Sequence, residues 1–211
     1  EKDEMLAYDY TRKGHLVAVI TNGTAVLGLG DIGPAAGMPV MEGKCALFKE
    51  FAGIDAFPIC VDSKDPEELV NIIYKISKSF GGINLEDIAA PACFEVETRL
   101  KEMCDIPVFH DDQHGTAIVV SAAMLNAARL KGVKPENMKI VLNGAGAAGI
   151  SIAKLLISIG FTNITLCDIF GTLYEGGPAL SDAQRQMAKI TNKEKLAGTL
   201  ADAMKGADAF I

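Results

Sequence analysis

The chain has no cluster of lysine or arginine residues anywhere along its 211 residues. It carries 20 lysines and arginines against 27 aspartates and glutamates, which gives a formal net charge of −7 at pH 7. Nucleic acids and anionic membrane surfaces bind proteins through concentrated positive charge. The sequence therefore predicts neither of them as a partner.

Long apolar runs are missing as well. The longest ones fall far short of the roughly 20 residues that a membrane-spanning helix needs, and the opening residues do not read as a signal peptide. Cysteine is sparse, odd in number and without any C-x-x-C pair, which is typical of reduced proteins, so we expect a cytoplasmic protein. The five cysteines are Cys45, Cys60, Cys93, Cys104 and Cys167.

The remaining composition, 49% hydrophobic and 22% charged, is that of an ordinary globular protein with one large or two small domains. Residues 16–20 and 25–29 are strand-like runs on either side of Asn22-Gly23, a dipeptide favoured in hairpin turns. A helix is predicted after residue 44, with three large apolar residues on its inner face. These are Leu47, Phe48 and Phe51.

Further elements follow at regular intervals, and the alternation of strands and helices predicts an α/β fold. Residues 56–61 form an apolar run that predicts a buried strand, and Asp65 is placed to cap a helix that starts at the proline after it. Glu86 and Asp87, an adjacent pair of acids, end the next short apolar run. A helix is predicted over residues 94–103.

A second pair of adjacent acids, Asp111 and Asp112, lies between a short β-type segment and a long helix-forming run. Neighbouring carboxylates repel, and a divalent cation or a buried lysine neutralises such a pair best. Ligands of α/β folds bind at the carboxyl ends of strands, where this pair would lie. The alternative is a helix start, with Asp112 accepting hydrogen bonds from the first turn.

A G-x-G-x-x-G motif occupies Gly144 to Gly149, directly between a predicted strand and a predicted helix. A second strand ends in Asp168, at about the 20-residue spacing typical of dinucleotide-binding folds. Asp168 would accept from the ribose hydroxyls and repel a 2′-phosphate, which favours NAD over NADP; alternatively it is a turn residue before Gly171. The residues expected to hold the cofactor loop are Asn143, Gly144, Ala145, Gly146, Ala147, Ala148 and Gly149.

The last residues, 207–211, look like the start of another strand. A dinucleotide-binding sheet needs more strands than precede this point, and an unpaired sheet edge associates readily with other chains. We therefore expect the chain to be a fragment of a longer protein that lacks both ends.

Six stretches together closely resemble malic enzymes, with the shorter bacterial type as the nearest match. They are residues 22–33, 41–44, 51–55, 84–88, 109–117 and 143–149. The resemblance implies oxidative decarboxylation of L-malate to pyruvate and CO₂ with NAD or NADP and Mg²⁺ or Mn²⁺. It also implies a malic-type α/β substrate and metal domain over residues 1–130, then part of a Rossmann-like doubly wound parallel sheet, an incomplete NAD(P)-binding domain, over residues 131–211. A homodimer or higher homo-oligomer that acts on a small-molecule substrate is expected.

Transferred by position, the family's metal ligands match Glu86, Asp87 and Asp112, its general base matches Lys44, and the neighbouring carboxylate matches Asp111. Three carboxylates form a hard oxygen site that suits Mg²⁺ or Mn²⁺. A lysine becomes a base when its pKa falls, and burial and a nearby cation would lower the pKa of Lys44, whereas Asp111 would raise it.

Two positions depart from the family pattern. The general acid of the family is a tyrosine ahead of this chain's first residue, so we expect this stretch alone to be inactive. Animal-type members carry an arginine for the substrate carboxylate where this chain has Ala25. The tyrosines without a matching context are Tyr8, Tyr10, Tyr74 and Tyr174.

Three other functions compete with this hypothesis. The chain could be a non-catalytic dinucleotide-binding or regulatory module in which the acids only cap helices. It could be a metallohydrolase with His110 and His114 as ligands, although H-x-x-x-H lacks the glutamate that zinc proteases need. An amino-acid dehydrogenase also places a substrate domain before a Rossmann domain, but it needs no carboxylates for a metal.

Overall fold

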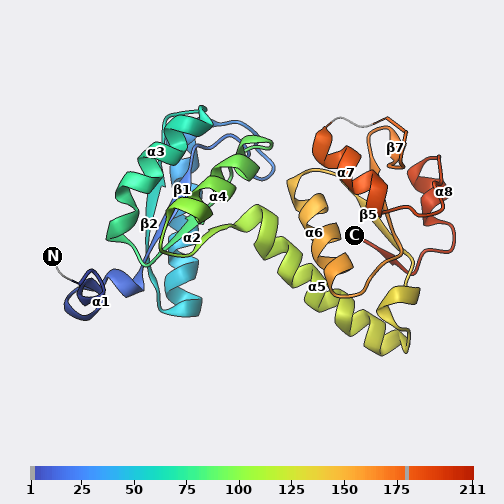
Figure 1. Ribbon diagram of the computed structural model, residues 1–211, viewed down its shortest axis with the longest axis horizontal. Helices are drawn as coiled ribbons and strands as arrows, with labels where there is room; N and C mark the ends of the chain where they lie inside the picture. The colour runs from blue at the N-terminus through green and yellow to red at the C-terminus, as the bar shows by residue number, and fades with distance from the viewer. Residues whose placement is uncertain (1–2, 179–180) are drawn as a thin grey trace. The chain divides into compact units, whose positions relative to one another are not determined.

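The computed structural model describes residues 3–178 and 181–211 (Figure 1). The chain forms two compact units, Glu1–Asp111 and Asp112–Ile211. Both combine parallel strands with helices, which confirms the predicted α/β class. Within the described residues, no helix is both long enough and apolar enough to cross a membrane.

The first unit is built on a four-stranded sheet in the order β2-β1-β3-β4. All three pairings in this sheet are parallel, so the carboxyl ends of its strands lie along one edge. The strands are β1 (Leu16–Thr21), β2 (Asp55–Cys60), β3 (Gly82–Leu85) and β4 (Val108–His110). The helices are α1 (Leu6–Tyr10), α2 (Gly33–Ala52), α3 (Pro66–Ile76) and α4 (Ala92–Met103), with 3₁₀ turns η1 (Lys13–His15) and η2 (Ser77–Ser79).

The hairpin predicted at Asn22-Gly23 is wrong. Strand β1 pairs only with parallel neighbours, and residues 25–29 contain a single bridge, between Val26 and Gly30, in place of a strand. The carbonyl of Gly23 accepts hydrogen bonds from the N–H groups of Ile32 and Gly33, so this segment folds back onto the start of α2. A Cβ at residue 23 would lie 2.2 Å from the carbonyl oxygen of Gly33, so only glycine fits at this position.

The inner face predicted for the helix after residue 44 is also wrong for two of its three residues. Leu47 and Phe51 are 53% and 83% exposed, whereas Met41 and Cys45 are buried against Val19 of β1. The helix begins earlier than predicted, at the residue after Ile32, and small and medium side chains spaced four residues apart form its buried stripe. Of the predicted stripe, Leu47 and Phe51 are left facing outward, and Phe48 packs against the core.

Other local predictions are confirmed. The carboxylate of Asp65 accepts from the N–H of Glu67 and caps α3, which begins with the expected proline. Helix α4 begins two residues before the predicted start and ends at the predicted residue. Strand β2 is present, but its residues are half-buried or exposed because β2 lies at the edge of the sheet.

The second unit has a four-stranded sheet in the order β7-β6-β5-β8, with β7 antiparallel to β6 and the other pairings parallel. The strands are β5 (Ile140–Asn143), β6 (Ile164–Asp168), β7 (Gly171–Thr172) and β8 (Ala209–Phe210). The helices are α5 (Asp111–Lys131), α6 (Ala147–Ser158), α7 (Asp182–Ile190) and α8 (Leu200–Met204), with the 3₁₀ turn η3 (Pro135–Asn137).

Helix α5 packs with the second unit. Its buried residues Met124 and Ala128 share one apolar core with Leu142 of β5 and Leu156 of α6. The compact units therefore divide after Asp111, whereas the sequence predicts a division between residues 130 and 131. The assignment of functions to two domains stays a prediction.

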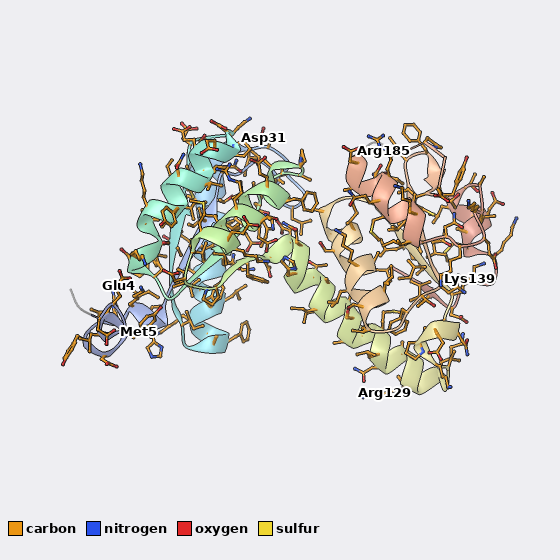
Figure 2. The ribbon with its side chains drawn as sticks, in the orientation of Figure 1. Glu4, Met5, Asp31, Arg129, Lys139 and Arg185 are labelled. Carbon is orange, nitrogen blue, oxygen red and sulfur yellow. The ribbon has the colours of Figure 1, made fainter. Side chains whose placement is uncertain are left out.

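Strand β8 is anchored by Asp208, the residue just before it. One oxygen of its carboxylate accepts from the N–H of Lys139 at 2.8 Å and the other pairs with the ammonium of Lys131. The side chain of Lys139, labelled in Figure 2, donates to the carbonyl of Lys205 at 2.7 Å. These contacts hold the predicted last strand beside β5.

Candidate active site

Acidic side chains collect where β3 and β4 end. Glu86 and Asp87 directly follow β3, and Asp112 is the second residue of α5, which starts as soon as β4 stops. Each of the three offers a carboxylate oxygen, and these oxygens all lie within 4.8 Å of one another. Glu86 and Asp87 are 8% and 4% exposed, so little water reaches them.

This donor set fits a hard divalent cation. Three negative charges at such separations repel strongly where water is scarce, and a cation among them removes that cost. Carboxylate oxygens are the ligands that Mg²⁺ and Mn²⁺ prefer. The described residues thus contain a chemically suitable place for the metal that the sequence predicts.

The geometry bears on both alternatives for the acids and histidines. Asp111 and Asp112 are the first two residues of α5, so a capping role for Asp112 stays an alternative. The group of converging ligand atoms includes neither His110 nor His114. His110 is fully buried, and its backbone N–H donates to the carboxylate of Glu97 at 3.0 Å.

Two donors converge on one oxygen of Glu86. The amide of Asn84 donates to Oε2 at 2.8 Å, and the ammonium of Lys44 lies 3.0 Å from the same atom. Burial raises the pKa of Glu86 above its usual value, and the Asn84 hydrogen bond and the Lys44 charge offset only part of this effect. Sequence reasoning missed Asn84, although a polar residue inside an otherwise apolar strand is a signal that could have found it.

Lys44 connects α2 to this acidic edge. Its Nζ lies 2.6 Å from Oδ2 of Asp111, 67 positions further along the chain, in addition to its contact with Glu86. Burial lowers the pKa of Lys44, but hydrogen bonds and ion pairs with Asp111 and Glu86 outweigh burial, and the net pKa is raised. The chain's own groups therefore raise this pKa, because a second carboxylate joins the one that the sequence indicated, and the lowering expected from a bound cation stays a prediction.

The cofactor loop has the backbone that its glycines predict. Gly144 has a φ of +119°, its N–H donates to the carbonyl of Cys167, and α6 begins immediately after Gly146. A Cβ at Gly149 would lie 1.8 Å from the carbonyl oxygen of Gly144, so no larger residue fits there. The N–H groups and the dipole at the start of α6 attract an anion.

Asp168 lies at the end of β6, as predicted, and pairs with Gly171 across the short β6–β7 hairpin. Gln184 of α7 donates from Nε2 to Oδ2 of Asp168 at 2.5 Å and to the carbonyl of Ala145 at 3.2 Å. This buried glutamine joins the acid to the cofactor loop. Sequence reasoning missed it, because no motif surrounds it and only the tertiary contact reveals its place.

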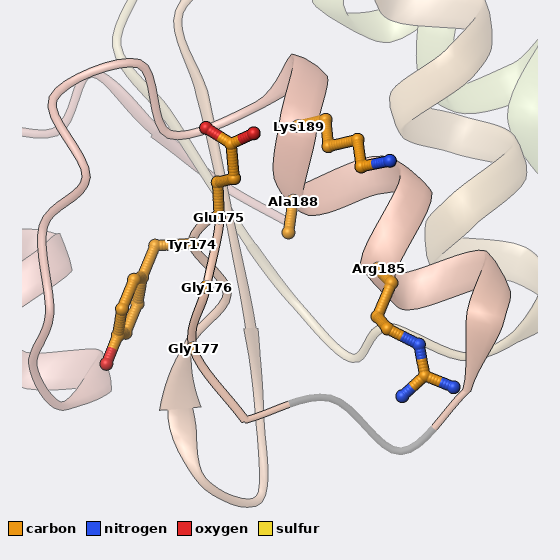
Figure 3. A pocket seen from close by; sticks show the side chains of 7 residues that line it. All are labelled: Tyr174, Glu175, Gly176, Gly177, Arg185, Ala188 and Lys189. Atoms are coloured by element: carbon orange, nitrogen blue, oxygen red, sulfur yellow. The ribbon is translucent and has the colours of Figure 1, made fainter.

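A separate hollow lies between α7 and the segment after β7. Figure 3 shows Arg185 and Lys189 projecting from α7 and Tyr174 projecting from the other side. Arg185 is paired with Asp182 at 2.7 Å, so part of its charge is already neutralised within the helix. Among the described residues, none that lines this hollow belongs to the acids or to the cofactor loop.

Two family models match the chain in sequence order. Residues 2–101 match the malic enzyme N-terminal domain, and residues 113–207 match the malic enzyme NAD binding domain. Together they cover nearly the whole chain and bear out the predicted order of a malic-type domain before a cofactor domain.

Individual relatives agree with this match. The bifunctional malic/malolactic enzyme of Bacillus subtilis is 55% identical over 97% of this chain and 50% of its own length. The NAD-dependent malic enzyme of Geobacillus stearothermophilus is 55% identical over 100% of this chain and 44% of its own length. The NADP-dependent malic enzyme of Escherichia coli is 50% identical over 100% of this chain and 28% of its own length. The chain thus spans about half the length, or less, of these curated relatives.

The fold agrees equally well with a solved structure. The NAD-dependent malic enzyme of Thermotoga maritima superposes with a TM-score of 0.97 and 51% identity, over 100% of this chain and 56% of that one. Sequence, domain order and fold all point to the same conclusion: the chain belongs to the malic enzyme family.

Proposed function

We propose that this chain supplies the metal ligands, the general base and the cofactor loop of an enzyme that converts L-malate to pyruvate and CO₂ with NAD or NADP. One observation carries the proposal. Lys44 is hydrogen-bonded to Asp111 and Glu86 at the same edge of the sheet where three carboxylate oxygens converge. A lysine, an orienting acid and a divalent-cation site are what removal of a proton from a 2-hydroxy acid requires.

Glu86, Asp87 and Asp112 are the residues proposed to hold Mg²⁺ or Mn²⁺. When bound, the cation supplies a Lewis acid for the C2 oxygen and for the negative charge that develops as CO₂ departs. The carboxylates also set the charge of the site, because three acids around a divalent cation leave a net negative charge. The remaining negative charge favours a positively charged group nearby, and Lys44 already lies beside Glu86.

Lys44 is proposed to take the proton from the C2 hydroxyl of malate. Its raised pKa means that the amine is protonated at neutral pH, so a proton must leave before it can act as a base. Asp111, 2.6 Å from Nζ, holds the amine through an existing hydrogen bond. A cation bound beside the lysine would favour release of its proton to water, so we propose that Lys44 and Asp111 work as a pair, in which Asp111 fixes the direction of the amine.

The second unit is proposed to bind the dinucleotide at residues 143–149, with the pyrophosphate at the start of α6 and the ribose at Asp168. The carboxylate of Asp168 would repel a 2′-phosphate, which favours NAD over NADP. The named relatives include both NAD- and NADP-dependent enzymes, so family membership alone leaves this choice open.

We also propose a cytoplasmic homodimer or higher homo-oligomer. Large apolar residues such as Leu27, Phe51 and Leu130 are more than 80% exposed in the isolated chain. Association with a second protomer would remove such side chains from water. Size-exclusion chromatography with light scattering would measure the state directly, and a strictly monomeric protein would contradict this part.

The test is an assay of the complete gene product with malate, Mn²⁺ and either cofactor, following formation of NADH or NADPH by absorbance. Malate-dependent reduction that stops when Mn²⁺ is chelated is the expected result. The rival function, a non-catalytic dinucleotide-binding module, predicts cofactor binding without turnover and without Mn²⁺ binding. The same experiment with an amino acid in place of malate would detect amino-acid dehydrogenase activity.

A further inference from the structure

The turn that carries Glu86 and Asp87 has an unusual backbone. Asp87 has a φ of +52°, in the left-handed region that residues other than glycine seldom adopt. Such a conformation persists only where the surrounding structure holds it. The contacts that hold this turn therefore control where its two carboxylates point.

Two of those contacts come from the segment after β1, which we call the 22–25 clamp and which consists of Asn22, Thr24 and Ala25. The N–H of Ala25 donates to the carbonyl of Asp87 at 3.0 Å. The hydroxyl of Thr24 accepts from the N–H of Ala89 at 2.9 Å. The clamp thus grips the turn on both sides of Ile88, through residues 60 or more positions away in the sequence.

The hydroxyl of Thr24 has a second role that fixes its orientation. It donates its single proton to Oδ1 of Asn22 at 2.6 Å, so only its lone pairs face Ala89. Asn22 is 4% exposed, and its amide donates to the carbonyl of Ser63 at 3.0 Å. A buried side chain tied to a third segment therefore sets the position of the hydroxyl, and the hydroxyl in turn positions the acidic turn.

We propose that Thr24 is a positioning residue, whose hydroxyl holds the turn so that the carboxylates of Glu86 and Asp87 face a single cation. This inference rests on the metal site of the proposed function and adds a residue to it. Thr24 itself touches neither the cation site nor the reacting groups; it acts through Ala89 and Asp87. Without its hydroxyl, the N–H of Ala89 loses this partner, and the turn that keeps Asp87 at a positive φ is held less firmly.

The test compares Thr24→Val, which keeps the shape and removes the hydroxyl, with Thr24→Ser, which keeps the hydroxyl. Mn²⁺ affinity is measured by isothermal titration calorimetry on the metal-free protein, and thermal unfolding is followed without metal. Thr24→Val should weaken Mn²⁺ binding by about fivefold to tenfold, the effect of one lost hydrogen bond of ordinary strength, and Thr24→Ser should restore it to within about twofold.

The matched control is Thr98→Val, because the exposed hydroxyl of Thr98 donates to the carbonyl of Phe94 within its own helix, α4. This variant should bind Mn²⁺ like the wild type. Should Thr24→Val unfold, Thr24→Ala replaces it and removes the hydroxyl without added bulk.

Two negative results would distinguish a failure of the role of Thr24 from a failure of the metal site. Equal Mn²⁺ affinity of Thr24→Val and the wild type would overturn the role of Thr24 alone, and so would equal weakening by Val and Ser. No binding of Mn²⁺ by the wild type would overturn the metal site itself and, with it, the proposed function.

Discussion

Replacing Lys44 with alanine tests the centre of the proposed chemistry. In the structure Nζ of Lys44 makes two short contacts, to Asp111 and to Glu86, and alanine removes both. A lost general acid or base lowers turnover by about 10²- to 10⁴-fold, which corresponds to roughly 3 to 5 kcal/mol of transition-state stabilisation. The fall should appear mainly in kcat, because the amine accepts a proton in the transition state and contributes little to ground-state binding of malate.

The metal site provides the internal comparison for this variant. Lys44 shares Oε2 of Glu86 with Asn84, and this second donor remains when the lysine is removed. Removal of a positive charge near a cation site also reduces repulsion of the cation. Mn²⁺ affinity should therefore be unchanged or slightly higher in Lys44→Ala, as measured by calorimetry.

The assay is steady-state malate oxidation with Mn²⁺ in the complete gene product, run at several pH values. A matched control is Lys49→Ala, on the same helix, because Lys49 forms an exposed ion pair with Asp55 away from the acids. Lys49→Ala should retain wild-type turnover. Near-normal kcat in Lys44→Ala would remove this lysine from the mechanism, and equal losses of kcat and Mn²⁺ affinity would make its role structural.

Three further outcomes are expected. Asp168→Ser should shift preference toward NADP by removing the charge that repels a 2′-phosphate, and an unchanged ratio of kcat/KM for the two cofactors would make Asp168 a turn residue. Gln184→Leu should weaken NAD binding by about tenfold, because it leaves the carbonyl of Ala145 and one oxygen of Asp168 without this donor; fluorescence titration with NADH measures it, and unaltered affinity would contradict the role. The pKa of Asp208 is lowered by its hydrogen bond to Lys131, so its stabilising effect exists above the ordinary carboxylate pKa and disappears as the pH falls through the lowered value. Asp208→Asn should therefore unfold at a lower temperature than the wild type at pH 7, with the gap narrowing toward pH 3, and a gap independent of pH would refute the linkage.

Local features were predictable from the sequence where the cause is local. Asp65 caps α3 because a short carboxylate two positions before a helical N–H can reach it without any help from the rest of the fold. The loop from Gly144 to Gly149 is as predicted because Gly144 takes a positive φ and Gly149 packs against Gly144 within the loop itself. The family resemblance added the identities of the acids and of Lys44, since these motifs are short and specific.

The predictions that were wrong depended on contacts between distant segments. Asn22-Gly23 favours a hairpin in isolation, but β1 pairs with a parallel strand on each side. The carbonyl of Gly23 accepts hydrogen bonds from the start of α2. Phe51 has the spacing of a core residue, yet the buried stripe of α2 is chosen by which residues meet β1. In both cases, packing against partners far along the chain outweighs the local preference.

The arrangement of the site was likewise decided by the tertiary structure. Parallel strands bring the ends of β3 and β4 to one edge, which places Glu86 near Asp111 although the sequence separates them. Lys44 then meets two carboxylates instead of one, and the balance between burial and charge raises its pKa when burial alone would lower it. A residue's chemistry depends on the summed field of its neighbours, and only the folded chain determines who those neighbours are.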